Sequence, residues 1–147
     1  MDKLLDDQIV EQIGEAFAEL KEPVQILLFG SHKNCEYCAE VRQLLEEVSA
    51  THDKVGVTVY DLQADKELAA QYLVDKAPTI LIAAKDGAQI SNLGVQFAGI
   101  PSGHEFSTLI NDVMMVSSRD SGLSAEVREF LKSLNQPLLL QVFVTPT

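Results

Sequence analysis

The stretch VQILLFGSHKNCEYC, residues 24–38, joins an apolar run to a pair of cysteines. The apolar residues at 24–29 predict a buried strand. Apolar residues then recur at helical spacing, which predicts a helix over 36–50. Asn34 is suited to cap that helix, which places Cys35 in its first turn. Unpaired N–H groups and the positive end of the dipole at a first turn favour a thiolate, the nucleophile of disulfide exchange.

The C-x-x-C spacing of Cys35 and Cys38 is compatible with three kinds of chemistry. The two thiols can close into a disulfide, so that the second releases what the first has captured. They can instead bind a metal, as half of a zinc site with His32 as a third ligand, or in an iron–sulfur cluster shared between two chains. A zinc site needs a fourth ligand, and the chain has no other cysteine. They can also form an inert buried pair. We favour dithiol–disulfide exchange and expect no metal.

The composition is that of an ordinary globular protein. Hydrophobic residues make up 46% of 147 residues, a length that suits one domain with an appendage. A net charge of −11 argues against nucleic acid or an anionic membrane as the partner. The N-terminus lacks a signal-peptide pattern, and no apolar run approaches the ~20 residues of a membrane span. Two cysteines, both in C-x-x-C, fit a reducing compartment, so we expect a cytoplasmic protein.

The rest of the chain alternates helical and strand patterns. An amphipathic helix at about 4–21 ends before Pro23, and the turn residues at 85–88 indicate a hairpin. Ser102 and Glu105 have the spacing of a capping box, which predicts a helix start. Helices are expected at 4–21, 36–50, 65–72, from 102 onward and at 124–135, and strands at 24–29, 55–61, 79–84, 94–98 and 138–144. This order predicts an α/β fold whose mixed central sheet is flanked by helices.

The beginning and the end of the chain share one pattern of helix, proline and strand. At an offset of 114 residues, Phe17 aligns with Leu131, Pro23 with Pro137 and Phe29 with Phe143. We interpret residues 1–118 as a complete unit, and residues 119–147 as a linker, helix and strand that begin a truncated second unit. An apolar strand without its own sheet is a template for pairing. We therefore expect the strand at 138–144 to dock on its own unit, or to pair with another chain and give a homodimer.

A second signal is the sequence Lys76-Ala77-Pro78-Thr79, directly before the apolar strand at 79–84. A proline in this position is either the ordinary first residue of a strand or a cis proline that shapes a site. The residues themselves leave both interpretations open.

Together these motifs resemble the thioredoxin/glutaredoxin superfamily over about residues 24–116. The resemblance consists of a strand ending in C-x-x-C, the segment Val57–Asp61, A-P-T before an apolar strand, and the Lys-Asp-Gly turn at 85–87. FAGIPSGHEF at 97–106 and VFVTPT at 142–147 are similar to the glutaredoxin-like protein disulfide oxidoreductases, which carry two thioredoxin-fold units in tandem. The resemblance implies a thioredoxin-like fold, with the first helix and strand of a second unit appended.

The same resemblance implies roles for single residues. Cys35 would be the attacking cysteine and Cys38 the resolving one. Pro78 would be the cis proline beside the disulfide, and the backbone of Ala77 would pair with an extended substrate segment. From its position between the cysteines, Tyr37 is expected to be a partly exposed aromatic residue that shapes the substrate surface.

The implied activity is that of a protein-disulfide oxidoreductase, an enzyme of cell redox homeostasis and electron transport. Such an enzyme needs no cofactor beyond its own cysteines. Its substrates would be protein disulfides, and a thioredoxin reductase-type donor or a small thiol would recycle it.

Glu36 and Asp61 carry two further hypotheses. Glu36 puts negative charge beside Cys35, which opposes ionisation of the thiol, and we expect a reduction potential of roughly −200 to −270 mV for the pair. The alternative is a solvated glutamate that only favours the helix dipole. Asp61 either lies under the active site and transfers protons, or simply ends its strand.

Three rival interpretations remain open. The N-terminal tandem domain of the alkyl hydroperoxide reductase flavoprotein is one, although in that family the first unit generally lacks this cysteine pair. The other two are a metal-binding thioredoxin-fold module, with zinc or a shared iron–sulfur cluster, and a redox-silent interaction domain.

Overall fold

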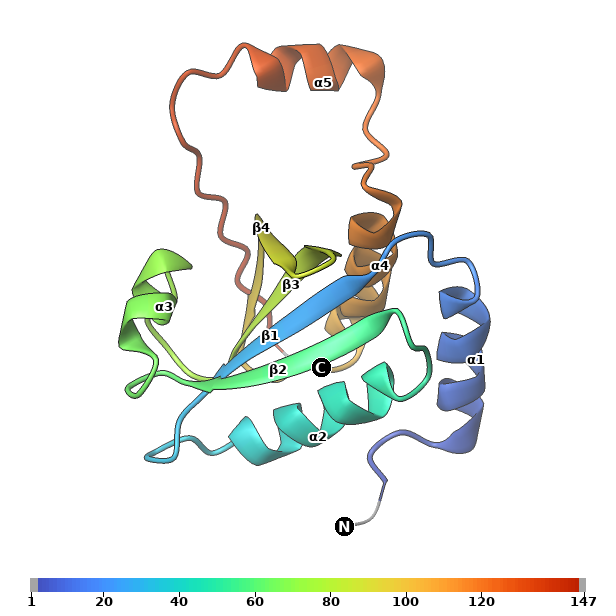
Figure 1. Ribbon diagram of the computed structural model, residues 1–147, viewed down its shortest axis with the longest axis vertical. Helices are drawn as coiled ribbons and strands as arrows, with labels where there is room; N and C mark the ends of the chain where they lie inside the picture. Colours follow the sequence, from blue (N-terminus) through green and yellow to red (C-terminus); the bar gives the residue numbers. More distant parts are fainter. Residues whose placement is uncertain (1–2, 146–147) are drawn as a thin grey trace.

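The core of the computed structural model, which describes residues 3–145, is a four-stranded mixed sheet in the order β2-β1-β3-β4 (Figure 1). Strand β1 (Val24–Gly30) pairs in parallel with β2 (Val55–Asp61) and antiparallel with β3 (Thr79–Asp86). A hairpin joins β3 to β4 (Gln89–Ala98), with Gly87 in the left-handed region at φ +63°. The predicted mixed sheet and hairpin are thus confirmed, and β4 begins five residues earlier than the expected return strand at 94–98.

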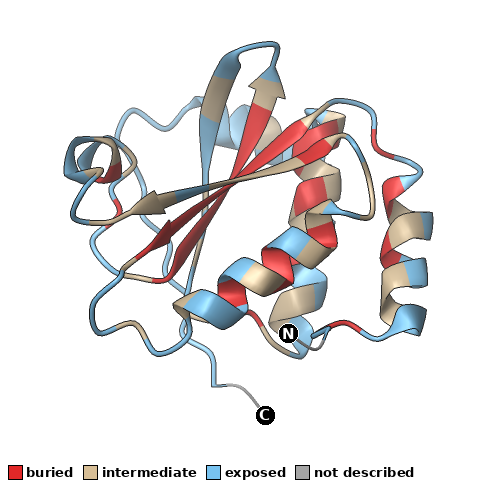
Figure 2. Cartoon of the chain, turned by 60° about the horizontal axis from the view of Figure 1, so that its bottom comes forward, coloured by how far each residue is buried: buried red, intermediate tan, exposed pale blue. Residues whose placement is uncertain are grey.

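Helices cover both faces of the sheet (Figure 1). One face and the larger hydrophobic core lie against α1 (Asp7–Phe17), α2 (Cys38–Ser49) and α4 (His104–Ser118). The short helix α3 (Lys66–Gln71) covers a smaller cluster on the other face, which includes Phe29. Val24, Ile26 and Leu28 of β1 belong to the larger cluster, and Leu27 and Phe29 belong to the smaller one. Every residue of β1 is buried (Figure 2). This two-sided burial explains the continuous apolar run, because a central strand with both faces covered has no solvent side.

The start of α2 differs from the prediction. The helix begins at Cys38, with Tyr37 at the N-cap position and no side-chain cap, so Cys35 lies before the helix and not in its first turn. Asn34 adopts the left-handed region at φ 56°, which asparagine tolerates better than most residues, and a residue in that conformation does not cap a helix. The first-turn environment therefore applies to Cys38.

The predicted capping box at the start of α4 is also absent. The helix begins at His104, Gly103 occupies the N-cap position at φ 57°, and no side chain accepts a cap hydrogen bond there. Ser102 contributes only its backbone carbonyl, which accepts the Glu105 N–H at 3.2 Å. Gly103, at φ 57° and ψ −123°, occupies the N-cap position in place of Ser102, which the spacing of Ser102 and Glu105 does not report.

The end of α4 is fastened to the loop between α1 and β1. The buried Ser117 hydroxyl accepts the N–H groups of Lys21 (2.9 Å) and Glu22 (3.1 Å) and donates to the Glu22 carbonyl (2.7 Å). Arg119 donates to the carbonyls of Pro23 and Lys85, each at 3.0 Å. These bonds hold the end of α4 against the rest of the unit, and the packed part of the chain ends near residue 119.

Beyond this point the chain leaves the packed unit (Figure 1). Helix α5 (Ala125–Lys132) confirms a helix in this segment, but none of its residues is buried. The predicted strand at 138–144 is wrong, because that stretch is irregular and Leu140 and Phe143 are 85% and 89% exposed. Of the two expected outcomes for this stretch, docking on its own unit is not seen, because the described residues are exposed, and pairing with another chain stays a prediction. The last two residues of the VFVTPT motif, 146 and 147, lie outside the described residues.

No helix within residues 3–145 is long and apolar enough to cross a lipid bilayer.

Candidate active site

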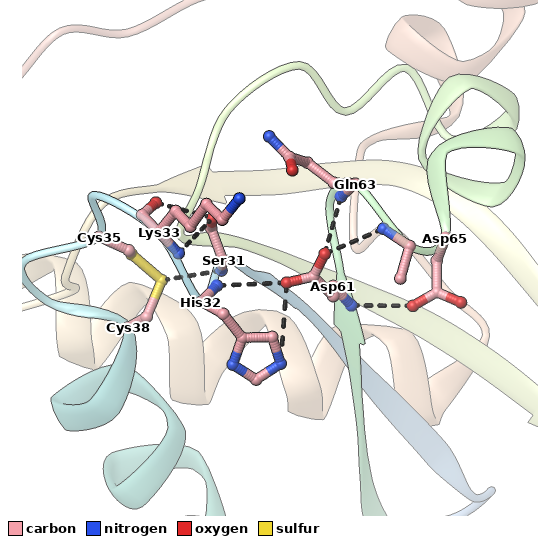
Figure 3. Close-up of polar contacts among 9 residues, drawn as sticks. Ser31, His32, Lys33, Cys35, Cys38, Asp61, Gln63 and Asp65 are labelled. Carbon is pink, nitrogen blue, oxygen red and sulfur yellow. Dashed lines mark hydrogen bonds and ion pairs between the residues drawn. A yellow bond between two sulfur atoms is a disulfide. The ribbon is translucent and has the colours of Figure 1, made fainter.

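A disulfide joins Cys35 and Cys38 just beyond the carboxyl end of β1 (Figure 3). The Ser31 N–H donates to Cys38 Sγ at 3.4 Å. Cys38 is also the first residue of α2, where the helix dipole favours negative charge. Two features of the backbone therefore stabilise a thiolate at Cys38, whereas the sequence had assigned the dipole effect to Cys35.

The loop that carries Cys35 is held in shape by its own side chains. The Ser31 hydroxyl donates to the Lys33 carbonyl at 2.8 Å and accepts the Lys33 N–H at 3.1 Å. Asn34 then turns the chain in the left-handed region. This compact turn places the disulfide beyond the carboxyl end of β1, at the start of α2.

Asp61, the last residue of β2, anchors the same loop from the other side (Figure 3). Its carboxylate accepts the N–H groups of Ala64 (2.9 Å), Gln63 (3.0 Å) and His32 (3.2 Å), and the His32 Nε2 lies 3.8 Å away. The N–H groups of Ala64 and Gln63, followed by that of His32, lower the pKa of Asp61. A carboxylate held in its ionised form is a poor proton acceptor, so the geometry favours the strand-end role over proton transfer.

Pro78 lies at the same end of the sheet as the disulfide loop. Thr79 pairs with Phe29, so Pro78 comes level with Gly30, where β1 leads into that loop. The Ala77–Pro78 peptide bond is cis, which is one of the two alternatives left open by the sequence. The Gly99 N–H donates to the Pro78 carbonyl at 2.9 Å. Among the described residues, none forms a hydrogen bond with the backbone of Ala77, which therefore has a free donor and acceptor at the end of the sheet that carries the disulfide loop.

Glu36 and Tyr37 lie on the surface between the cysteines. Tyr37 is 45% exposed, and its carbonyl accepts the Val41 N–H at 2.9 Å, which begins the α2 ladder. The Glu36 side chain is exposed. Both side chains are thus accessible to a partner that approaches the disulfide.

A cavity of about 710 Å³ opens beside the disulfide, between the start of α2 and the end of β2. Besides Cys35 and Cys38, its lining includes Leu28, Gly30, Ser31, His32, Ala39, Arg42, Val59, Tyr60 and Asp61. Sequence reasoning missed Arg42 and Tyr60. Arg42 follows Cys38 by four residues, one helical turn, and that spacing is the signal that could have found it.

The structure gives no support to a metal site built on His32. Within residues 3–145, no group of three or more His, Cys, Asp and Glu side chains is placed to hold an ion. The imidazole of His32 faces Asp61, while the two cysteines are bonded to each other.

The fold and the site define a thioredoxin-fold protein with a redox-type C-x-x-C disulfide. No family model matches the chain. Among solved structures, a protein disulfide oxidoreductase from Aeropyrum pernix is 27% identical, with a TM-score of 0.77, over 90% of this chain and 57% of that one. The N-terminal domain of the alkylhydroperoxide reductase AhpF from Enterococcus faecalis is 25% identical, with a TM-score of 0.75, over 85% and 58%.

The curated relatives include several F subunits (AhpF) of alkyl hydroperoxide reductases. AhpF from Staphylococcus epidermidis is 26% identical over 139 residues, which are 88% of this chain and 24% of that protein. AhpF from Pseudomonas aeruginosa is 27% identical over 131 residues, which are 89% of this chain and 22% of that protein. This chain thus spans about a quarter of the length of these relatives.

These likenesses confirm the predicted resemblance to thioredoxin-fold disulfide oxidoreductases and support a redox function of the Cys35–Cys38 dithiol. The N-terminal domain of the alkyl hydroperoxide reductase flavoprotein was a rival interpretation of the sequence. It is similar to this chain to nearly the same degree as the protein disulfide oxidoreductase is. Both neighbours are oxidoreductases with the thioredoxin fold, so the general redox assignment holds for either relationship.

Proposed function

We propose that this chain is an enzyme that exchanges electrons with protein disulfides through Cys35 and Cys38. The observation that carries the proposal is the Cys35–Cys38 disulfide at the edge of the sheet, with the unpaired backbone of Ala77 beside it. A reactive disulfide next to a free strand-like backbone is suited to a substrate that binds as an extended segment.

The proposed reaction has two steps. In the reduced protein, the Cys35 thiolate attacks one sulfur of the substrate disulfide, which forms a mixed disulfide and releases the other substrate sulfur as a thiolate. The Cys38 thiolate then attacks Cys35 Sγ, which releases the second substrate thiolate and leaves the Cys35–Cys38 disulfide. Two electrons pass to the substrate, and solvent exchanges the two protons with the thiols.

The assignment of Cys38 as the resolving cysteine is supported by its surroundings. The Ser31 N–H and the start of α2 both stabilise negative charge on Cys38 Sγ. In the second step Cys38 must be a thiolate, and in the reverse direction it is the leaving group, which departs faster when its pKa is lower. The first step requires a thiolate at Cys35 as well, so the leaving-group role is the one that the surroundings of Cys38 support.

Substrate contacts are proposed for Tyr37, Ala77 and Pro78. The free Ala77 N–H and carbonyl would pair with the substrate backbone, and the cis Pro78 would shape the wall beside the disulfide. Tyr37 offers an exposed aromatic surface next to Cys35.

Glu36 is proposed to tune the pair, because a carboxylate beside Cys35 opposes formation of the thiolate. Substitution Glu36→Gln would then lower the thiol pKa and shift the reduction potential. If both quantities stay unchanged in a thiol titration and a redox titration, Glu36 is only a solvated residue.

Several finer assignments are proposals of the same kind. Electrons would come from a thioredoxin reductase-type donor or a small thiol, and the protein would work in the cytoplasm without any cofactor besides its cysteines. Residues 1–118 would form the catalytic unit, and 119–147 the start of a second unit. The exposed apolar stretch at 138–144 would pair with another chain, which would give a homodimer.

Trapping of the mixed disulfide tests the proposed reaction. A Cys38→Ser variant should accumulate a covalent adduct with a protein disulfide such as that of insulin, because the resolving thiol is missing. A Cys35→Ser variant is the matched control and should form no adduct. Equal adduct formation by both variants, or by neither, would contradict the assigned order of attack.

A further inference from the structure

The chain reverses after α3 in a compact turn that is closed by backbone hydrogen bonds. Tyr72 is the C-cap residue of the helix, and the Leu73 N–H donates to the Ala70 carbonyl at 3.1 Å. The Val74 N–H donates to the Ala69 carbonyl at 2.8 Å. This pair of bonds is the Schellman motif, in which the residue after the C-cap adopts the left-handed region. Leu73 occupies that position, at φ 58°.

Leucine is an unfavourable residue at this position. Glycine is usual there, because the Cβ atom of an L residue is strained in the left-handed region, and asparagine tolerates that region better than an aliphatic residue does. Burial does not offset the strain, since the Leu73 side chain is 84% exposed. The packed unit therefore gains nothing from this leucine. A strained residue without a structural return is typical of a functional surface.

The neighbours of Leu73 hold it in this conformation. Tyr72 and Val74 both pack into the cluster under α3 that includes Phe29. The Gln96 Nε2 of β4 donates to the Tyr72 carbonyl at 2.7 Å. The exposed leucine is thus fastened on both sides to the packed unit, which gives its side chain a fixed place on the surface.

That place lies near the proposed binding position of the protein substrate. Leu73 belongs to the segment that leads from α3 to Pro78 and β3, at the end of the sheet that carries the disulfide loop (Figure 1). Four peptide units separate Leu73 from Ala77, so their Cα atoms are at most roughly 14 Å apart. An extended substrate segment rises about 3.3 Å per residue. A substrate bound along Ala77 therefore covers this distance with about four residues.

The rest of the segment offers a partner little apolar surface. Val74 is buried, and Asp75 and Lys76 form an ion pair with each other. The Lys76 carbonyl is also occupied, because it accepts the Thr79 hydroxyl at 2.8 Å. Leu73 is therefore the main apolar contact that this segment presents.

We infer that Leu73 determines substrate specificity by contacting an apolar side chain of the protein substrate, within about four residues of the reactive substrate cysteine. The inference rests on the proposed function, because it names the kind of substrate that binds beside Ala77. Leu73 acts in binding alone and takes no part in thiol exchange. The strain at Leu73 is then a cost in stability that is retained for recognition.

Reduction of two matched peptides tests the inference. Each peptide carries one internal disulfide, and the two differ only within four residues of the cysteines. These positions hold leucine and valine in the apolar peptide, and serine and threonine in the polar peptide. The reduced full chain is mixed with each peptide, and the second-order rate constant is measured by acid quench, alkylation and mass spectrometry. The wild type should reduce the apolar peptide roughly three- to ten-fold faster, the effect of one good apolar contact at an interface.

Two substitutions of Leu73 separate recognition from strain. Leu73→Ala removes the contact and keeps a Cβ atom in the left-handed region, whereas Leu73→Gly removes both the contact and the strain. Both variants should bring the ratio of the two rate constants close to one. Only Leu73→Gly should raise the midpoint of denaturant unfolding, so its loss of selectivity cannot come from a damaged fold. A lower midpoint for Leu73→Gly would show that the leucine serves the packing of the unit, and would overturn the inference.

Leu4→Ala provides a matched control with the same loss of side chain. Leu4 is 47% exposed, and its N–H binds Glu47, near the end of α2 that is remote from Cys38. This variant should keep the wild-type ratio. An equal loss of selectivity in Leu4→Ala and Leu73→Ala would overturn the inference, because the effect would not depend on the position of the leucine.

The remaining outcomes distinguish this inference from the proposed function. If the wild type reduces both peptides at equal rates, Leu73 selects no apolar substrate and the inference fails alone. If Leu73→Ala changes only the oligomeric state in analytical ultracentrifugation, Leu73 contacts a second copy of the chain, and the inference fails as well. If the reduced wild type reduces neither peptide nor the small disulfide bis(2-hydroxyethyl) disulfide, the proposed function fails too.

Discussion

Two regions with matching sequence patterns differ completely in burial: one is packed into the core and the other is exposed. Helix α1 and strand β1 are packed into the unit, whereas α5 and residues 138–144, which repeat their pattern, lie exposed. Phe29 is 0% exposed and its counterpart Phe143 is 89% exposed. Strand β1 pairs with β2 and β3 on its two sides, while the described part of the C-terminal stretch has no neighbouring strand. An apolar pattern becomes a strand only where other strands accept its backbone groups.

Substitution of the two aligned phenylalanines, Phe29 and Phe143, should give the largest difference in stability between the two regions. Phe29 stacks on Tyr60 with ring centroids 5.2 Å apart and contributes to the core under α3. Phe29→Ala should lower the free energy of unfolding by about 3–5 kcal/mol. Phe143→Ala should change it by less than about 0.5 kcal/mol. Denaturant unfolding measures both values, and a large loss for Phe143→Ala would show that the tail packs in solution.

The helix caps give a second contrast of intermediate size. The Asp6 carboxylate accepts the Ile9 N–H at 2.8 Å, and the Ser124 hydroxyl accepts the Val127 N–H at 3.3 Å. Asp6→Ala should cost about 1 kcal/mol of global stability, because α1 is part of the core. Ser124→Ala should affect only α5, seen as faster amide exchange there with unchanged global unfolding. Equal global losses would contradict an unpacked α5.

One carboxyl group in each region, Asp112 in the packed unit and Asp120 beside α5, predicts how stability depends on pH there. Burial raises the pKa of Asp112 in α4, so its stabilising contribution is present at low pH and is lost as pH rises through that pKa. Asp112→Asn should therefore stabilise the protein at neutral pH, and the gain should vanish in acid. The Gly122 N–H and then Arg128 lower the pKa of Asp120 beside α5.

Asp120→Asn is the control for this pH experiment. A lowered pKa gives stability that is lost as pH falls, but here it concerns only the local structure around α5. Global unfolding of Asp120→Asn should follow the wild type at every pH. A pH-dependent global difference would show that this segment folds together with the unit.

Removal of the exposed region should have the smallest effect. A variant without residues 121–147 retains Ser117 and Arg119, which fasten α4 to the loop before β1. Its free energy of unfolding should stay within about 0.5 kcal/mol of the full chain. A change in oligomeric state, measured by analytical ultracentrifugation, would support pairing of the tail with another chain. A marked loss of stability would contradict the boundary near residue 119.

The sequence was informative where one segment determines its own structure. The buried run of β1, the hairpin after β3 and the thioredoxin-like order of elements all follow from local patterns. The start of α2 did not, because the left-handed turn at Asn34 delays the helix to Cys38. The bond from His32 to Asp61 joins residues 29 positions apart, and no local pattern announces it. The strand at 138–144 failed because strand formation depends on neighbours, which sequence periodicity does not report.

A redox titration of the purified chain tests the central claim, that Cys35 and Cys38 form a working redox pair. Free thiols are counted by alkylation and mass spectrometry across a series of glutathione buffers. The account predicts one reversible two-electron transition, at roughly −200 to −270 mV, that disappears in Cys35→Ser. Thiols that stay in one state across the series, or that become accessible only after a chelator is added, would contradict it.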